Sequence, residues 1–560
     1  MSIQGLRQEL AHPRTSVQLC LLGILGGTCA ALLIILFRLC IESLQHLYVQ
    51  QVDNFTTMPA VDRFILPIVG ALLILLFAFI TGFKHYRMGI PYVIHRVKHR
   101  YGHIPLRTSI NQFFGGVIAL AAGFSVGREG PSVHLGAAGS TFFGQWLKLP
   151  YNSIRILAGC GIAAGISASF NTPFAAVIFV MEVVLREYKI HIFIPVMLAA
   201  ACGSVLTRLV FGEGSELALL TFNQFNNWFY LYLIPFGMAL GALATLFNNQ
   251  LMNIIRWFRP LTMASRLLLA GLLTGLVGYL LPEAMGSGMS SIQFVVNSPD
   301  NLMLLFAILA AKFLLTLIAL GLGIPGGVIG PVIGMGVLTG AILLLPLGLF
   351  MDDTSQYTGA FALLGLAGLL SAVLHAPLAA LSAVMELSFS PQVILPAMLV
   401  IVPAYVTSTQ LLGNRSIFIR QLDYQKLSYT SSSIREHLQK TGVMAEAQRD
   451  FKLFQDAQEH QLLRHLEQSP TDLVVQAQDF EIGIQYSLVQ YDISLSPDQS
   501  HPLKFLSMEG VPAQATLAEV YEILQAARDG AVYIYEDNPA DIVGVITWNR
   551  LRAQLMKEQY

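Results

Sequence analysis

Long stretches without a charged residue constrain this chain more than any other feature of its sequence. They lie at residues 15–37, 64–83, 226–255, 313–351, 358–385 and 392–414. A helix needs about 20 apolar residues to cross a bilayer, so these stretches predict a multi-pass, all-α membrane protein. The longer stretches are expected to hold two shorter helices each, because glycine and proline interrupt them, as in residues 321–336.

The composition divides the chain into two parts. Hydrophobic residues make up 54% of the sequence and charged residues 12%, which is about half the charged share of soluble proteins. This excludes a disordered chain, an ordinary soluble enzyme and a nucleic-acid-binding protein. Residues 421–560 nevertheless carry 11 basic and 20 acidic residues. We therefore expect a membrane domain over residues 15–425 and a soluble tail over residues 426–560.

The first 14 residues are expected to form a cytoplasmic segment. Arg7 and Arg14 precede the first apolar stretch, and basic residues favour the cytoplasmic side. That stretch lacks a small-residue cleavage site, so we interpret it as a retained helix. The five cysteines show no metal-ligand spacing and are interpreted as small buried hydrophobic residues. The sequence predicts neither a metal nor a cofactor.

An internal repeat runs through the membrane domain. Residues 167–183 align without gaps to residues 371–387, with eight of seventeen positions identical. Upstream, residues 127–136 pair with residues 327–336 in the same order. Duplicated halves with broken helices are typical of transporters and channels, whose site lies between the repeats near the membrane midplane. The repeats are expected over about residues 15–215 and 226–425.

Each repeat carries a glycine-rich loop that leads into a helix. The first loop is Gly-Arg-Glu-Gly-Pro at residues 127–131, and the second is Gly-Gly-Val-Ile-Gly-Pro at residues 326–331. Proline suits the first turn of a helix, so free amides and the positive end of the helix dipole face whatever lies in front. Two such helix N-termini can hold a small anion without a buried lysine, which would bind the ion too tightly for rapid release.

Glu129 lies inside the first loop. Its carboxylate is itself an anion, so it can occupy the anion site when deprotonated and leave it when protonated or displaced. This makes Glu129 a candidate gate. The alternative is a carboxylate that only stabilises a helix N-terminus, but an ionisable residue at membrane depth favours the gate. The neighbouring Arg128 is either a structural partner or a group that concentrates anions.

These two loops, together with the Asn-x-Pro-x-Ala pattern and Glu182 in residues 171–182, resemble the CLC family of chloride channels and chloride/proton exchangers. The resemblance covers about residues 15–425. It implies inverted repeats of broken and tilted helices, a homodimer with one anion pore in each subunit, and chloride held by backbone amides. Glu129 matches the family's gating glutamate. The matching anion contacts are Gly127, Arg128, Gly130, Gly327, Val328 and Ile329.

Two side-chain donors of the family pattern are replaced here. The usual Gly-Ser-Gly-Ile-Pro motif is Arg-Met-Gly-Ile-Pro at residues 87–91, so Met88 stands, beside Gly89 and Ile90, where a serine hydroxyl contacts chloride. Phe418 stands where a tyrosine hydroxyl reaches the ion. We therefore expect coordination mainly by backbone amides and weaker central anion binding, unless water supplies a donor.

A third difference concerns protons. In family exchangers a second glutamate loads protons from the cytoplasmic side, and Val183 occupies that position here. Valine cannot carry a proton, so passive conduction is favoured. The adjacent Glu182 is the candidate for another proton route. The alternative, which we favour, is a helix-end carboxylate near water, because Glu386 ends the equivalent unit of the second repeat.

The tail has a soluble pattern. Thr516 and Glu519 form a capping-box pattern that predicts a helix start, and Asp-Asn-Pro at residues 537–539 predicts a turn between two strands. The helix–strand–strand–helix order over residues 512–560 resembles half of a CBS domain. Residues 440–510 do not clearly supply the other half, so a structural or dimer-supporting tail is favoured over nucleotide binding.

The sequence thus predicts chloride transport through a pore gated by Glu129, channel-like or weakly proton-coupled, with cytoplasmic termini and surrounding lipid, in a bacterial inner membrane. Proton-coupled chloride exchange by a non-standard route is the second interpretation. An intramembrane enzyme using Glu129 and His134 is a remote third, because the sequence lacks His-Glu-x-x-His, Gly-x-Ser-x-Gly and paired catalytic aspartates. We interpret His134 as a packed structural residue.

Overall fold

The computed structural model describes residues 3–83, 89–212, 220, 222, 229–297, 301–349, 355–429, 432–480, 483–491 and 503–557. The chain divides into two compact units. The membrane unit comprises residues 20–143 and 156–429, and the tail unit comprises residues 1–19, 144–155 and 430–560. Met88 lies outside the described residues, so its anion contact stays a prediction.

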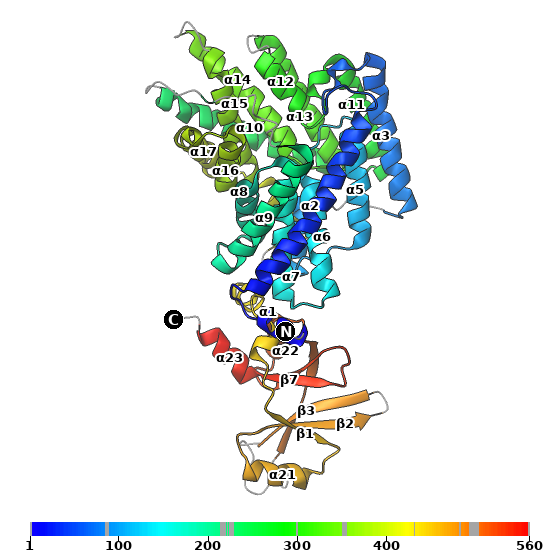
Figure 1. Ribbon diagram of the computed structural model, residues 1–560, viewed down its shortest axis with the longest axis vertical. Coiled ribbons are helices and arrows are strands. Elements are labelled where there is room, and N and C mark those ends of the chain that lie inside the picture. The colour runs from blue at the N-terminus through cyan, green and yellow to red at the C-terminus, as the bar shows by residue number, and fades with distance from the viewer. Residues whose placement is uncertain are drawn as a thin grey trace. The chain divides into compact units, whose positions relative to one another are not determined.

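Helices at many different tilts build the membrane unit (Figure 1). Nine helices of the described residues are long and apolar enough to cross a membrane. Seven of them are α2 (Val17–Gln45), α3 (Ala60–Ile80), α7 (Tyr151–Phe170), α9 (Ile190–Phe211), α10 (Phe229–Trp257), α11 (Met263–Leu280) and α13 (Leu302–Leu322). The eighth spans Ile329–Leu347 and contains α14 (Ile329–Leu344). The ninth spans Pro391–Leu411 and contains α17 (Ile394–Val406).

The membrane unit contains further helices outside these spans. They are α4 (Ile90–His99), α5 (Leu106–Ala121), α6 (Glu129–Trp146), α8 (Pro173–Phe179), α12 (Met289–Asn297), α15 (Thr358–Leu374), α16 (Pro377–Ser388) and α18 (Ile417–Gln425). The broken helices predicted for residues 313–351 and 358–385 are confirmed, as α13 with α14 and α15 with α16. The same prediction is wrong for residues 226–255, whose described part lies in the single helix α10. Its one proline, Pro235, lies near the helix start, where it removes only one hydrogen bond.

Helices α6 and α7 cross at small residues that let their backbones approach closely. A Cβ atom on Gly161 would lie 2.1 Å from the carbonyl oxygen of Gly136. The hydroxyl of Ser140 donates to the carbonyl of Leu157 at 2.7 Å. The second repeat has the same contact between α14 and α15, where a Cβ atom on Gly365 would lie 2.2 Å from the Gly336 carbonyl. Such contacts are typical of membrane helix pairs, and they fix the two helices that carry the glycine-rich loops.

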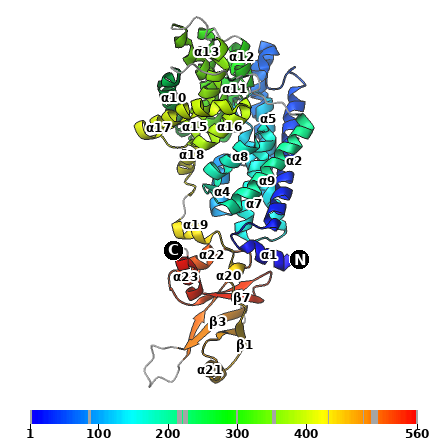
Figure 2. The ribbon, with the colours of Figure 1, turned by 60° about the vertical axis from the view of Figure 1, so that its left-hand side comes forward.

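The tail unit contains two sheets (Figure 2). The first has the order β1-β2-β3-β4, with β1 parallel to β2 and the other pairs antiparallel. The second has the order β5-β6-β7, with β5 parallel to β6 and β6 antiparallel to β7. The strands are β1 (Phe451–Gln455), β2 (Leu473–Phe480), β3 (Gly483–Tyr491), β4 (Leu503–Ser507), β5 (Glu509–Pro512), β6 (Ala531–Tyr535) and β7 (Ile542–Thr547). The helices of this unit are α1 (Ile3–Ala11), α19 (Ser433–Leu438), α20 (Val443–Glu446), α21 (Glu459–Gln468), α22 (Leu517–Leu524) and α23 (Trp548–Lys557).

The predicted capping box of the tail is confirmed. Thr516 is the N-cap of α22, and its backbone N–H donates to Glu519 Oε2 at 2.9 Å. This fixes the start of the helix that follows β5. The predicted strands on either side of the Asp-Asn-Pro turn are β6 and β7, which pair directly.

Two segments distant in sequence belong to the tail unit. The N-terminal helix α1 ends at Ala11, whose carbonyl accepts a hydrogen bond from the N–H of Gly442 at 2.9 Å. In the loop between α6 and α7, the N–H of Tyr151 donates to the carbonyl of Gln514 at 2.8 Å. The ammonium of Lys148 in the same loop pairs with Asp537, and this hydrogen bond lowers the pKa of that carboxyl. The core of this unit therefore includes the end of the N-terminal helix α1.

Candidate anion site

The two glycine-rich loops meet in the middle of the membrane unit. The N–H of Gly127 donates to the carbonyl of Gly327 at 2.8 Å, and the N–H of Gly327 donates back to Gly127 at 2.7 Å. This reciprocal exchange is an antiparallel bridge between equivalent glycines of the two repeats, so the first loop is joined directly to the second.

The carboxyl of Glu129 lies between the two loops. Glu129 is the first residue of α6 and is only 1% exposed. Its Oε1 accepts a hydrogen bond from the N–H of Gly330, in the first turn of α14. Its Oε2 has no hydrogen-bond partner among the described residues. The Glu129 carboxyl therefore lies in front of α14 and engages an amide of its first turn.

Glycines pack closely around this carboxyl. A Cβ atom on Gly127 would lie 2.0 Å from Glu129 Oε2, and one on Gly327 would lie 2.8 Å from Glu129 Cδ. A Cβ atom on Gly130 would lie 2.7 Å from the carbonyl oxygen of Gly326. A larger residue at Gly130 or Gly327 would meet backbone of the other loop and push the loops apart, whereas one at Gly127 would displace the Glu129 carboxyl.

The remaining loop residues have distinct places. Val328 is the N-cap of α14 and Ile329 is its first residue; the amides of a first helical turn have no partner within the helix. Arg128 lies with its guanidinium 4.8 Å from the ring centre of Phe170. This stacking favours the structural role among the two predicted for Arg128.

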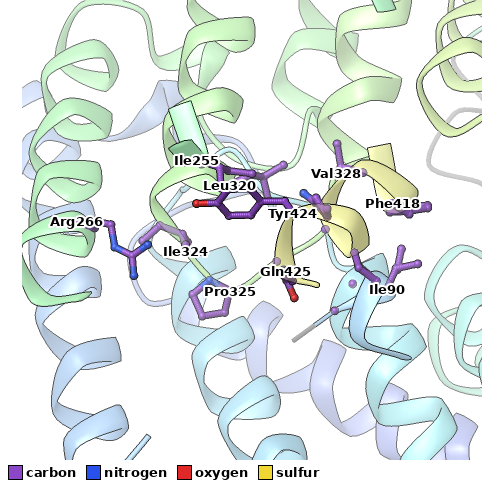
Figure 3. Close-up of a pocket in the computed structure, with 18 of the residues that line it drawn as sticks. Ile90, Ile255, Arg266, Leu320, Ile324, Pro325, Val328, Phe418, Tyr424 and Gln425 are labelled. Carbon is purple, nitrogen blue, oxygen red and sulfur yellow. The ribbon is translucent and has the colours of Figure 1, made fainter. Parts of the chain in front are cut away.

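A cavity of about 630 Å³ reaches these loops. The predicted residues that line it are Gly89, Ile90, Gly130, Gly327, Val328 and Phe418. Figure 3 shows Ile90, Val328 and Phe418 on one side of it, with Arg266, Ile324 and Pro325 opposite. Arg259, Arg266 and Lys426 also line it, and none of its described lining residues is acidic. A cavity with this charge attracts anions.

A second cavity of about 330 Å³ is lined by the residues discussed above for proton coupling. Val183 and Glu182 line it, together with Arg186 and His375. Phe418 lines both cavities and so lies between them. The buried Val183 gives this second cavity an apolar wall where an exchanger of the family has a carboxylate.

Glu182 and Glu386 each cap the start of a helix in the other repeat. The Glu182 oxygens accept hydrogen bonds from the N–H groups of Leu378 at 3.2 Å and Ala379 at 2.7 Å, at the start of α16. The Glu386 oxygens accept from Phe174 at 2.9 Å and Ala175 at 2.8 Å, at the start of α8. Glu182 is thus more than a helix-end carboxylate near water. Each glutamate satisfies amides at the helix start of the opposite repeat.

Replacing Glu386 with alanine is expected to lower the free energy of unfolding by about 1–2 kcal/mol, because two amides at the start of α8 lose their acceptor. Glu182→Ala should cost a similar amount. The apparent Tm of the purified protein measures both. Asp62→Ala is the matched control, since Asp62 is an exposed carboxylate in the first turn of α3, and it should change Tm less. A Tm unchanged in either glutamate variant would contradict the capping role.

Three polar residues in the membrane unit were not predicted from the sequence. Gln112 on α5 is buried and lines the first cavity. Lys312 on α13 is also buried, and its Nζ donates to the carbonyl of Gly286 at 2.6 Å. Asp53 accepts a hydrogen bond from the hydroxyl of Ser287 at 2.7 Å, so Lys312 and Asp53 hold the same short loop. For Lys312 a signal was available, because it is a lone charged residue inside an apolar stretch. Gln112 and Asp53 lie among other polar residues, so the sequence does not single them out.

His134 lies outside both cavities. Its ring stacks on Tyr92, with the ring centres 5.7 Å apart and the planes 12° apart. It is fully buried on α6. This agrees with its interpretation as a packed residue.

Comparisons with known proteins agree with this geometry. The sequence profile of the voltage gated chloride channel family matches residues 69–409. A putative chloride channel protein ClcB-like from Ralstonia nicotianae is 29% identical over 410 residues, which cover 71% of this chain and 94% of the relative. The H(+)/Cl(−) exchange transporter ClcA from Citrobacter koseri is 29% identical over 318 residues, covering 55% of this chain and 67% of the relative.

A solved structure has a similar fold. The crystal structure of a slow cyanobacterial Cl⁻/H⁺ antiporter superposes with a TM-score of 0.64 at 22% sequence identity, covering 73% of this chain and 97% of that one. These matches agree with a transport protein and not with an intramembrane enzyme. Together with the helical membrane unit and its paired loops, they show that this multi-pass integral membrane protein belongs to the voltage gated chloride channel (CLC) family of anion transport proteins.

Proposed function

We propose that this chain conducts chloride passively, or with weak coupling to protons, through a pore in each subunit that Glu129 gates. The buried carboxyl of Glu129 between the two loops carries the proposal. When the carboxyl is deprotonated, it accepts the hydrogen bond of the Gly330 N–H group, which is then not free to bind an anion. When it is protonated or displaced, that amide is released and the pore opens.

The first cavity supports an anion as the transported ion. Arg259, Arg266 and Lys426 raise the local anion concentration at low salt. The donors at the loops are backbone amides, which bind a halide without the strength of a full charge. This combination favours rapid passage over tight binding.

The second cavity bears on proton coupling. Val183 cannot bind a proton, and both oxygens of Glu182 are engaged by backbone amides. Passive conduction is therefore the favoured mode. Proton-coupled exchange is the second candidate, because Glu182 lines this cavity and one similar protein is named as an exchange transporter.

Chloride efflux from proteoliposomes, with external pH recorded at the same time, tests this proposal. We expect chloride flux under a potassium diffusion potential, without linked proton movement. An imposed uphill chloride gradient is the decisive condition. Protons driven against their own gradient would instead demonstrate exchange, and Glu182→Gln would then test that residue as the route. No chloride flux in either condition would refute chloride as the substrate.

We also propose the homodimer that the family resemblance implies. Large apolar side chains are exposed on α9 and α17, including Ile190, Leu209, Leu395 and Val402. A second subunit could cover part of these faces in the membrane. The molecular mass of the detergent-solubilised protein, measured by light scattering, tests this. The half-CBS resemblance of residues 512–560 suggests that the tail supports the same dimer.

A further inference from the structure

One buried polar side chain lines the first cavity without a hydrogen-bond partner. Gln112 lies on α5, is 1% exposed, and is among the residues that line the 630 Å³ cavity. Neither its Nε2 nor its Oε1 has a partner among the described residues. Buried amides are almost always hydrogen-bonded in folded proteins, so an unpaired one calls for an explanation.

The position of Gln112 relates it to the anion loops. Gly116, one turn further along α5, packs against the start of α6: a Cβ atom there would lie 3.0 Å from Pro131 Cγ. Residues four apart lie on the same face of a helix. Gln112 therefore faces the same side as the contact with Pro131, which directly follows Gly130. The cavity that Gln112 lines is also lined by Gly130 and Gly327.

The other side chains near these loops offer little to an anion. Ile90, Val328 and Phe418 are apolar. Among the described polar residues that line the cavity, Gln112 alone is fully buried. A side-chain amide has two N–H donors and no charge, and rotating it by 180° presents either nitrogen or oxygen to the cavity.

We propose that the Nε2–H group of Gln112 binds the transported anion in this cavity and sets how tightly the anion is held. The inference rests on the proposed chloride transport and adds a side-chain ligand to it. The amide replaces part of the anion's hydration shell as the anion nears the loops, while its oxygen accepts from water on the other side. Because the amide is neutral, the anion is released readily.

Calorimetric titration of chloride into the purified full-length protein, in a chloride-free buffer, tests this ligand. Gln112→Met keeps the length of the side chain and removes the donor, so chloride Kd should rise about tenfold, as expected for one lost hydrogen bond to an ion. Gln112→Lys supplies a charged donor, so Kd should fall. The two variants therefore have opposite expected signs.

Thr339→Val is the matched control. Thr339 lies on α14, outside the cavity, and its hydroxyl donates to the carbonyl of Met335 at 2.7 Å. This variant should bind chloride as the wild type does. Elution volume in gel filtration and apparent Tm show whether each variant is folded. If Gln112→Met does not fold, the test is made with Gln112→Lys.

The outcomes separate this inference from the proposed function. If the wild type binds chloride and both Gln112 variants bind it equally well, Gln112 is not a ligand and its amide is satisfied by water alone. If the wild type neither binds nor transports chloride, the proposed function fails and this inference fails with it. Weaker binding in Gln112→Met or tighter binding in Gln112→Lys, with an unchanged Thr339→Val, supports the ligand.

Discussion

Replacing Glu129 with alanine is expected to raise chloride flux about tenfold and to remove its dependence on pH. The wild-type carboxyl is buried between Gly127 and Gly327 and accepts the Gly330 amide. Losing one charge-assisted hydrogen bond is worth about 1.5–3 kcal/mol, enough to shift the open population by about tenfold or more. Flux assays in proteoliposomes measure both effects. They should cover about pH 4.5 to 7.5, because ordinary carboxyl and histidine groups titrate in that region.

The sign of the pH dependence follows from the gate. Protonation removes the charge that competes with chloride, so wild-type flux should rise as pH falls. Glu129→Gln keeps the shape of the side chain but cannot change charge, so its flux should be nearly constant with pH. Glu42→Gln is the control, because Glu42 pairs with Arg38 on α2, and it should keep the wild-type pH profile. A Glu129→Gln protein with that same profile would show that another group senses pH.

The substitution Gly161→Ala is expected to destabilise the membrane unit where α6 and α7 cross. The new Cβ atom would lie 2.1 Å from the Gly136 carbonyl oxygen and 2.4 Å from Ser140 Cβ. Overpacking of this kind costs about 1–3 kcal/mol, because backbone must move to relieve it. We expect a lower apparent Tm and a smaller fraction of monodisperse protein in gel filtration. Since α6 begins with Glu129, the chloride flux of the Gly161→Ala protein that does fold should also change.

Gly139→Ala is the matched control on α6. The nearest atom to a Cβ there is Ala30 Cα at 3.4 Å, an ordinary van der Waals distance. This variant should keep the wild-type Tm and flux. If Gly161→Ala is as stable as Gly139→Ala, the close crossing of α6 and α7 does not hold the helix that carries the proposed gate.

Local signals in the sequence were enough to predict two of the helix breaks, the glycine-rich loops and the tail's capping box, although the break expected within residues 226–255 is absent from α10. The glycine and proline pattern predicted where α13 and α14 separate, and Thr516 with Glu519 predicted the start of α22. Each of these features depends on residues a few positions apart. That is why the chain alone was sufficient to infer them.

Contacts between distant segments could not be predicted in the same way. Nothing local indicates that Gly127 and Gly327 bond to each other, or that Glu182 caps a helix that starts nearly 200 residues later. Gln112 looks like any polar residue in a small-residue helix until the cavity beside it is known. These features arise only when the two repeats pack, so they depend on the complete fold.

The composition of the tail unit limits how this chain can be shortened or recombined. Ala11 lies in one buried cluster with Leu438, Val443 and Leu517, and Asn152 Nδ2 donates to the Leu10 carbonyl at 3.0 Å. A protein cut after residue 429 would leave α1 and the loop over residues 144–155 without their core. In a chimera that carries a relative's tail, residues 1–19, 144–155 and 430–560 would therefore have to be exchanged together.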